Sequence, residues 1–248
     1  MNELFEASRV LDELGLCERQ SHPRISNLEN KECLLVEVSE KGIPEMVKLL
    51  PREQTVTLKR YAHGNQSSFP AIRAGGALLQ TEETETHITN PSITVDPDKL
   101  STFIQQLKSC PLAPAAEKYY IADDIKAELM ELTDTGEPTL AALKQLVAGF
   151  PEKKDAKIFA KHLVERMLDT AATTDNPHLR NCILNLLCNK NTVVVYFDVY
   201  ETLNFPTRVS SSETWKALIG SLDEQTGKGQ EVISPFTGKP VAGKGDNY

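Results

Sequence analysis

Two strand-like segments far apart in the chain constrain its fold more than any other feature. Residues 32–38, ECLLVEV, and residues 191–200, which contain TVVVYFDVY, are rich in the β-branched and aromatic side chains that favour strands. Mainly helical periodicity lies between them. Strands at both ends with helices in the middle are typical of an α+β fold rather than of alternating βαβ units. We therefore predict a mixed or antiparallel sheet from N- and C-terminal strands, with a helical middle section.

Apolar stripes and capping residues predict the individual helices. Helices are expected over residues 3–16, 43–50, 99–108, 122–132, 139–147, 155–172 and 210–222, with 179–187 helical or buried. The stripe expected on 155–172 consists of Ile158, Phe159, His162, Leu163, Arg166 and Met167. A further strand is expected at 55–60, followed by a polar loop at 61–68 and an apolar run at 69–79.

Changes of composition divide the 248 residues into four parts. Residues 1–80 form an N-terminal α/β part with a basic loop, and residues 81–190 form an acidic, mainly helical part. Residues 191–223 form a strand and a helix that return to the sheet. Gly, Lys and Pro dominate residues 224–248, which predicts a flexible tail or a truncated continuation.

Location and cofactors are constrained by apolar runs, cysteines and histidines. No apolar run approaches the roughly 20 residues of a membrane span, and the acidic, amphipathic N-terminus is unlike a targeting peptide. The five cysteines are scattered without C-x-x-C, which favours free thiols in a reducing compartment. The histidines form no H-x-x-x-H. These patterns predict a cytoplasmic protein with no metal site and no cofactor.

A local excess of positive charge marks residues 41–80. Six Lys and Arg stand there against two acids, a net charge of +4 within a chain whose net charge is −8. Such a basic segment predicts an anionic partner. The alternative is an ordinary solvated hairpin tip, which is the more common role of a sequence such as NQSS.

Cations and amides alternate within this segment in a way that suits nucleic acid. Lys and Arg neutralise phosphates, Ser hydroxyls and backbone amides bind phosphate oxygens, and Asn and Gln pair with base edges. The predicted nucleic-acid-binding residues are Arg52, Lys59, Arg60, His63, Asn65, Gln66, Ser67, Ser68 and Arg73. Because the rest of the chain is acidic, we expect binding to require a larger assembly that supplies most of the positive charge.

Motifs for catalysis are incomplete. The segment 238–245 nearly matches the phosphate-binding loop G-x-x-x-x-G-K-[ST], but Gly245 replaces the hydroxyl residue. Asp98, Asp123 and Asp124 lie where helices start, which favours capping roles. Asp198 lies in a predicted strand, where nucleases often place a metal-binding carboxylate, but no partner carboxylate is evident. His162 is expected in the core and His178 in a solvated loop. No catalytic residue is predicted, and the chain is expected not to be an enzyme.

The order of these landmarks resembles the large subunit of type I CRISPR Cascade surveillance complexes, closest to subtype I-C. The likeness lies in helix 4–16 leading to CLLVEV, then LPR at 50–52, KR at 59–60 and GNQSS at 64–68. Later landmarks are LSTFIQQL at 100–107, VVVYFD at 193–198, TWK at 214–216 and FTGKPV at 236–241. The family usually has a cysteine near Ser234 or Pro235, which this chain lacks, and its members extend further.

The resemblance implies a non-catalytic subunit in antiviral defence that is the N-terminal portion of a longer protein. Such a subunit contacts the guide RNA end and recognises the protospacer-adjacent motif in duplex DNA. It works with other Cascade subunits and a recruited helicase-nuclease. By resemblance, the segment 59–68 would read the motif.

Two other functions remain open from the sequence. The acidic segment 81–137, with twelve acids and four bases, would suit a protein–protein adaptor or scaffold. A metal-dependent nuclease would use Asp198 together with acids of the helical middle section.

Overall fold

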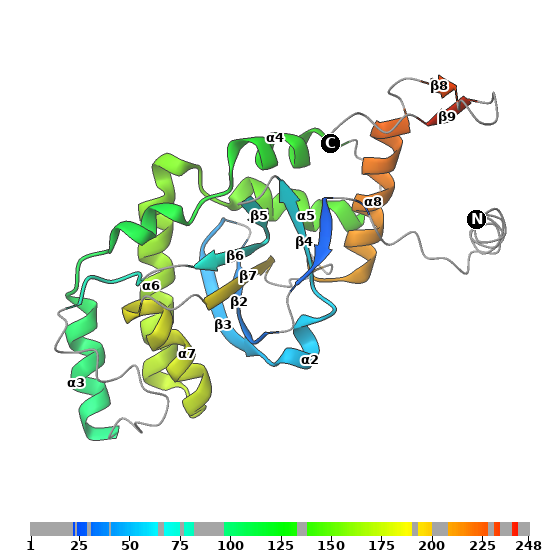
Figure 1. The fold of residues 1–248 in the computed structure, drawn as a ribbon. Helices are drawn as coiled ribbons and strands as arrows, with labels where there is room; N and C mark the ends of the chain where they lie inside the picture. The colour runs from blue at the N-terminus through cyan, green and yellow to red at the C-terminus, as the bar shows by residue number, and fades with distance from the viewer. Residues whose placement is uncertain are drawn as a thin grey trace.

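The protein has an α+β fold in which two sheets share a helical layer (Figure 1). The computed structural model describes residues 22, 24–28, 31–39, 41–63, 67–74, 77–81, 97–132, 138–189, 193–199, 208–227, 231–233 and 240–242. The predicted α+β class, with a mixed sheet and a helical middle section, is confirmed.

The larger sheet has four strands in the order β3-β2-β7-β6. Strands β2 (Cys33–Val38) and β3 (Pro44–Leu50) form an antiparallel pair, and β7 (Val193–Val199) lies parallel to β2. Strand β6 (Ala71–Ala74) pairs antiparallel with the other side of β7. The two strand-like segments of the sequence are therefore neighbours in the centre of one mixed sheet.

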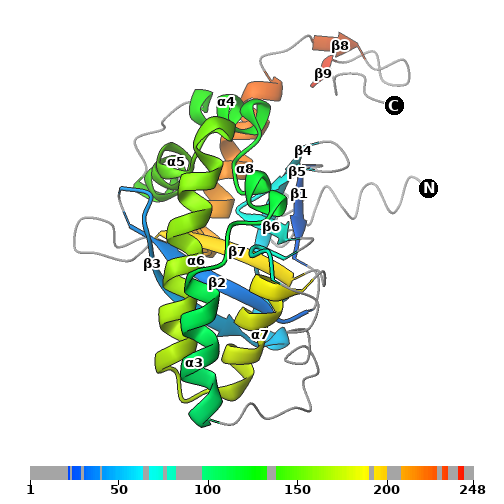
Figure 2. The same ribbon diagram turned by 90° about the vertical axis from the view of Figure 1, so that its left-hand side faces the viewer.

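Alternation along the strands gives this sheet two different faces. One face carries Leu34, Val36, Val195 and Phe197 into the main core, where the helices cover it. Figure 2 shows α6 and α3 side by side over this face. The other face, which includes Tyr196, packs against a smaller cluster.

The helical layer comes mostly from the middle of the chain. Its elements are α3 (Pro97–Lys108), the 3-10 turn η2 (Pro114–Lys118), α4 (Asp123–Glu131), α5 (Pro138–Gly149), the 3-10 turn η3 (Lys153–Asp155), α6 (Ala156–Thr173) and α7 (Pro177–Cys188). Helix α8 (Ser212–Gly227) follows β7 and packs against α5. The predicted helices at 99–108, 122–132, 139–147 and 155–172 are confirmed with small shifts of their ends, and the segment 179–187, expected to be helical or buried, is helical.

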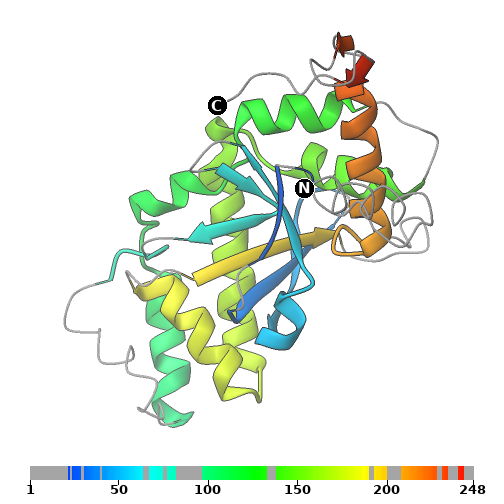
Figure 3. The same cartoon turned by 45° about the vertical axis from the view of Figure 1, so that its right-hand side comes forward.

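The smaller sheet has three antiparallel strands in the order β1-β4-β5. They are β1 (Ile25–Asn27), β4 (Lys59–His63) and β5 (Ser67–Phe69). The short helix α2 (Arg52–Thr55) connects β3 to β4. Figure 3 shows this sheet over the face of the larger sheet that the helices leave uncovered. There the Tyr196 hydroxyl donates to the Lys59 carbonyl oxygen at 3.2 Å.

Four phenylalanines join the sheets to the helices. The ring of Phe150 lies 5.3 Å from Phe69 of β5, 4.9 Å from Phe159 of α6 and 4.8 Å from Phe197 of β7, measured between ring centroids. Such tilted and edge-on pairs are the favoured aromatic arrangements.

Two local predictions in the first eighty residues are wrong. Residues 43–50 form strand β3 rather than a helix, because Val47 and Leu49 face the main core in alternation while β2 supplies a hydrogen-bonding partner. Pro44 is tolerated because it is the first residue of the strand. The strand expected at 55–60 lies four residues later, and its predicted start belongs to α2.

The predicted stripe on α6 is also partly wrong. Ile158 is 59% exposed and His162 is exposed, whereas the buried row includes Ala160, Val164 and Leu168. The short side chain of Ala160 allows the helix to approach its neighbours closely, so the packed face is rotated from the one that the larger residues suggested.

The predictions for the two ends of the chain have different outcomes. The helix expected at 3–16 lies outside the described residues. Helix α8 continues to Gly227, and a strand pair follows in β8 (Glu231–Ile233) and β9 (Pro240–Ala242). None of the helices in the described part of the chain has the length and apolar character needed to span a bilayer.

Candidate nucleic-acid interface

The predicted basic loop is largely strand, and it forms the centre of the smaller sheet. Ile25, Tyr61 and Phe69 lie opposite one another across the three strands and are buried. The alternate positions, including Ser26, Arg60 and Ser68, therefore belong to the other face. The ten or so residues of these strands include Lys59, Arg60 and no acid.

Arg60 is held across two strands. It lies opposite Ser26 in the register, and its Nε donates to the Ser26 Oγ at 3.1 Å. This bond uses one of the five donors of the guanidinium group. No described residue forms an ion pair with Arg60.

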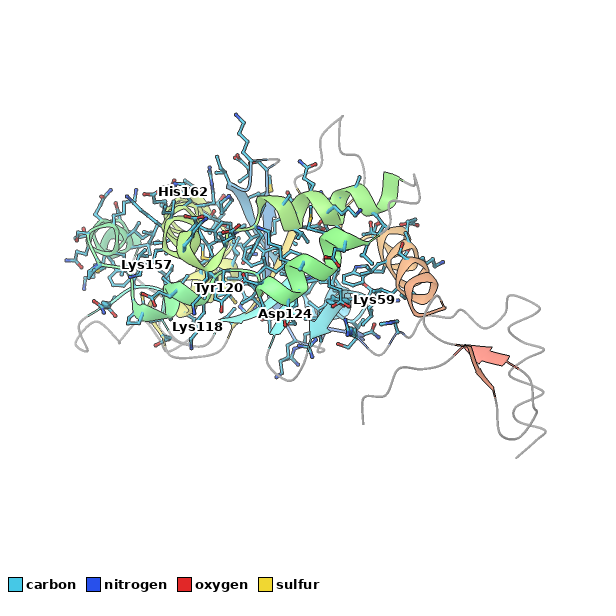
Figure 4. The ribbon with its side chains drawn as sticks, turned by 90° about the horizontal axis from the view of Figure 1, so that it is seen from above. Lys59, Lys118, Tyr120, Asp124, Lys157 and His162 are labelled. Atoms are coloured by element: carbon cyan, nitrogen blue, oxygen red, sulfur yellow. The ribbon has the colours of Figure 1, made fainter. Side chains whose placement is uncertain are left out.

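Lys59 lies beside it at the start of β4 and opposite Asn27, which is exposed. Its backbone is fixed by the hydrogen bond from Tyr196, whereas no described residue pairs with its ammonium group. Figure 4 shows Lys59 far from Lys118 and Lys157, which lie toward the other end of the molecule. Arg52 is exposed on α2, one short connection before β4.

Four other predicted binding residues lie on strands β4, β5 and β6. His63 lies in β4, Ser67 in β5 and Arg73 in β6, and Ser68 donates through its hydroxyl to the Ala71 carbonyl oxygen at 2.6 Å. Asn65 and Gln66 lie outside the described residues.

A structural ion pair neutralises one of the cations of the segment 41–80. The Lys48 ammonium lies 2.9 Å from the carboxylate of Glu37, which is 1% exposed. Glu45, one of the two acids of the segment, lies 3.8 Å from Arg166 of α6, a cation outside the segment. Arg52 on α2 and Lys59 and Arg60 at the start of β4 have no ion-pair partner among the described residues, and we call these three residues the β4 basic surface.

Arg24 borders this surface, and the sequence analysis missed it. Its guanidinium group pairs with Glu128 of α4 and donates to the Tyr61 hydroxyl at 3.0 Å. Burial raises the pKa of Tyr61, while the Arg24 charge lowers it and Asp124 raises it. Arg24 thus links the smaller sheet to α4. Only the RISN segment at 24–27 could have signalled strand β1, and three residues are too few for a periodic pattern.

Asp198, the candidate nuclease residue, is completely buried and bound to backbone amides. Its Oδ1 accepts from the Val199 and Val209 nitrogens at 2.8 and 2.7 Å, and Oδ2 accepts from the Ser210 nitrogen at 3.3 Å. The pKa of Asp198 is raised because burial disfavours its charge more than these hydrogen bonds and Arg208 favour it. These bonds give the carboxylate a structural role, which is to hold the loop that precedes α8.

Glu37 is the partner carboxylate that the sequence could not name. It lies beside Asp198 in the parallel register, at the carboxyl ends of β2 and β7. Its Oε1 accepts from Lys48 and from Arg208, each at 2.9 Å. Both carboxylates are therefore engaged by protein groups rather than aimed together at a vacant metal position. In α4, Asp124 accepts from the Ile125 nitrogen, as expected for an acid in a first turn.

Together, the fold and the surface define an α+β protein with a small group of cations on α2 and at the start of β4. No family model matches the sequence, and no curated protein or solved structure matches it either.

Proposed function

We propose that this chain is a non-catalytic nucleic-acid-binding protein that contacts duplex DNA through the β4 basic surface. The observation that carries the proposal is the position of Lys59 and Arg60. They are consecutive residues at the start of β4, so their side chains point to opposite faces of a sheet whose strands hold no acid, whereas Lys48 of the same segment is paired with Glu37. Two or three cations supply a few phosphate contacts.

Strong binding to DNA would require other subunits. An acidic chain with a small basic surface would bind duplex weakly alone and more strongly beside basic subunits. The resemblance to the Cascade large subunit supports such a setting. In it, the chain would contact the guide RNA end, recognise the protospacer-adjacent motif and act before a recruited helicase-nuclease.

The test is fluorescence anisotropy of a labelled duplex titrated with the 248-residue chain at several low salt concentrations. We expect saturable binding with a Kd of roughly 10⁻⁴ to 10⁻⁶ M that weakens steeply with salt. Lys59→Ala combined with Arg60→Ala should weaken binding to every duplex and reduce the salt slope by about 2, since each cation contributes close to one released counterion. Absence of saturable binding at the lowest salt would contradict the proposal.

A matched double variant controls for net charge. Lys118→Ala combined with Lys161→Ala removes two exposed cations from η2 and α6, away from the β4 basic surface. It should leave the slope nearly unchanged. An equal effect of both double variants would mean that only total charge matters, and the proposed surface would be rejected.

The motif-reading role has a separate readout. Asn65→Ala combined with Gln66→Ala should reduce the difference in affinity between duplexes of different sequence while preserving the salt slope. Amide side chains that contact base edges distinguish one DNA sequence from another, whereas contacts to phosphates do not. If the sequence preference stayed unchanged, motif reading by this segment would be wrong even if Lys59 and Arg60 bound phosphates.

A further inference from the structure

Three metal-ligand side chains meet between the residue before β2 and the first turns of α7. The His178 Nε2 lies 2.9 Å from both carboxylate oxygens of Glu32. The Cys182 Sγ completes the group, and the ligand atoms all lie within 4.8 Å of one another. Glu32 and His178 are 146 positions apart in the chain, so only the fold brings the group together.

Local structure fixes two of the three ligands. Asn176 caps α7 by accepting from the His178 and Leu179 nitrogens at 3.0 and 3.3 Å, and Pro177 begins the helix. His178 therefore lies in the first turn, contrary to the loop that the sequence predicted. Cys182 follows four residues later on the same helical face.

The third ligand is fixed by the sheet. Glu32 directly precedes β2, whose first residue, Cys33, is buried and pairs with both Leu50 and Val194. The backbone of Glu32 is thus held at the edge of a well-packed strand, facing α7.

We propose that Glu32, His178 and Cys182 form a binding site for a divalent metal ion of the zinc type. Imidazole nitrogen, thiolate sulfur and carboxylate oxygen are the ligands that Zn²⁺ takes in proteins. A tetrahedral ion with bonds of about 2.0 to 2.3 Å needs ligand atoms about 3.3 to 3.8 Å apart. The His178–Glu32 spacing of 2.9 Å is shorter than this, and all the ligand atoms lie within 4.8 Å of one another, so small side-chain rotations would admit an ion.

Three protein ligands leave a fourth position for water or another donor. That position has access to solvent, because the side chains of His178 and Glu32 are 59% and 37% exposed. The ion would replace the direct His178–Glu32 contact and would join the first turn of α7 to the start of β2.

Cobalt(II) is the probe, because its sulfur ligands produce a charge-transfer band and tetrahedral coordination produces strong visible bands. We expect the reduced chain to bind one Co²⁺ with both features, and Zn²⁺ to displace it. Cys182→Ser should abolish the charge-transfer band. His178→Gln and Glu32→Gln should each weaken Co²⁺ binding on the order of tenfold or more, as the loss of even an outer-shell partner does.

Cys188→Ser is the matched control, since Cys188 ends the same helix but lies outside the group. It should retain the band. The proposal is overturned if wild-type protein shows no charge-transfer band, if the band survives Cys182→Ser, or if Cys188→Ser removes it equally. If circular dichroism shows that Cys182→Ser does not fold, the exposed-ligand variants decide, and unchanged Co²⁺ affinity in both overturns it.

Discussion

At the scale of single residues, Asp198 and Glu37 show two ways of keeping a carboxylate in the protein interior. Asp198 is compensated by backbone amides of the loop before α8, and Glu37 by the cations of Lys48 and Arg208. The raised pKa of Asp198 shows that its hydrogen bonds do not fully offset the cost of burial.

Asp198→Asn should destabilise the protein by about 1 to 3 kcal/mol, because the amide nitrogen of Asn replaces one carboxylate oxygen and cannot accept a hydrogen bond from the backbone N–H that this oxygen binds. The penalty should also change with pH. Since the folded-state pKa is raised above 3.8, the folded protein holds a proton that the unfolded chain releases. Wild-type stability therefore declines relative to the variant as pH rises from 3.8 to the raised pKa.

Urea unfolding of both proteins across that pH range measures the difference between their free energies of unfolding. We expect the penalty of the substitution to shrink with rising pH and then to level off. A penalty that grows with pH would mean that the folded-state pKa is lowered rather than raised.

At the scale of elements, two glycines show that the effect of the same Gly→Ala substitution on stability depends on the surroundings of the residue. Gly42, in the turn between β2 and β3, has φ +75°, and an added Cβ would lie 2.1 Å from the Gly149 carbonyl oxygen at the end of α5. Gly220 lies within α8, where an added Cβ would meet nothing within 4 Å.

Gly42→Ala should therefore destabilise the protein by about 2 kcal/mol or more, since it combines backbone strain with a clash against main chain. Gly220→Ala should stabilise it by roughly 0.5 to 1 kcal/mol through helix propensity. Thermal and chemical unfolding measure both effects. If the two variants moved the Tm in the same direction, the turn of β2 and β3 would not pack against α5 as described.

The elements that sequence patterns predicted best are those with long periodic stripes. Helices α3 to α7 follow their predicted ranges because each buries several apolar residues on one side. Strand β3 was predicted as a helix because Pro44 suits the first position of a helix and Pro51 suits its end. The segment forms a strand because β2 supplies its hydrogen-bonding partner, and such pairing cannot be read from the sequence of one segment alone.

The residues of the candidate sites likewise include some that the sequence could predict and some that it could not. Lys59 and Arg60 were predictable because they are adjacent cations in a basic segment. Which cations of the segment can bind an anion depends on contacts that no local pattern indicates. Examples are the hydrogen bond from Arg60 to Ser26 and the ion pair between Lys48 and Glu37. The metal-ligand group could not be predicted from spacing, because Glu32 joins His178 and Cys182 only through the packing of α7 on the sheet.

At the scale of the whole molecule, β7 makes the fold one structural unit. It lies between β2 and β6, and its Phe197 packs in the aromatic group that joins both sheets to the helices. Without β7, one of the two central strand positions of the larger sheet would be empty, and β2 and β6 would have unpaired edges.

A chain ending at Asn189 should consequently lose cooperative unfolding and its near-ultraviolet circular dichroism signal. A chain ending at Gly227 is the control. It lacks β8 and β9, which pair with each other and with no other described strand, and it should unfold cooperatively. Cooperative unfolding of the shorter chain would contradict the central role of β7.

The late position of β7 also bears on how the protein is made. On the ribosome, β2, β3 and β6 emerge well before residue 193, and synthesis of residues 75–192 takes on the order of ten seconds. During that interval the nascent chain exposes the apolar edges that β7 will later cover. Chaperone binding to the nascent chain should therefore be strongest before residue 199 leaves the exit tunnel and should fall soon afterwards.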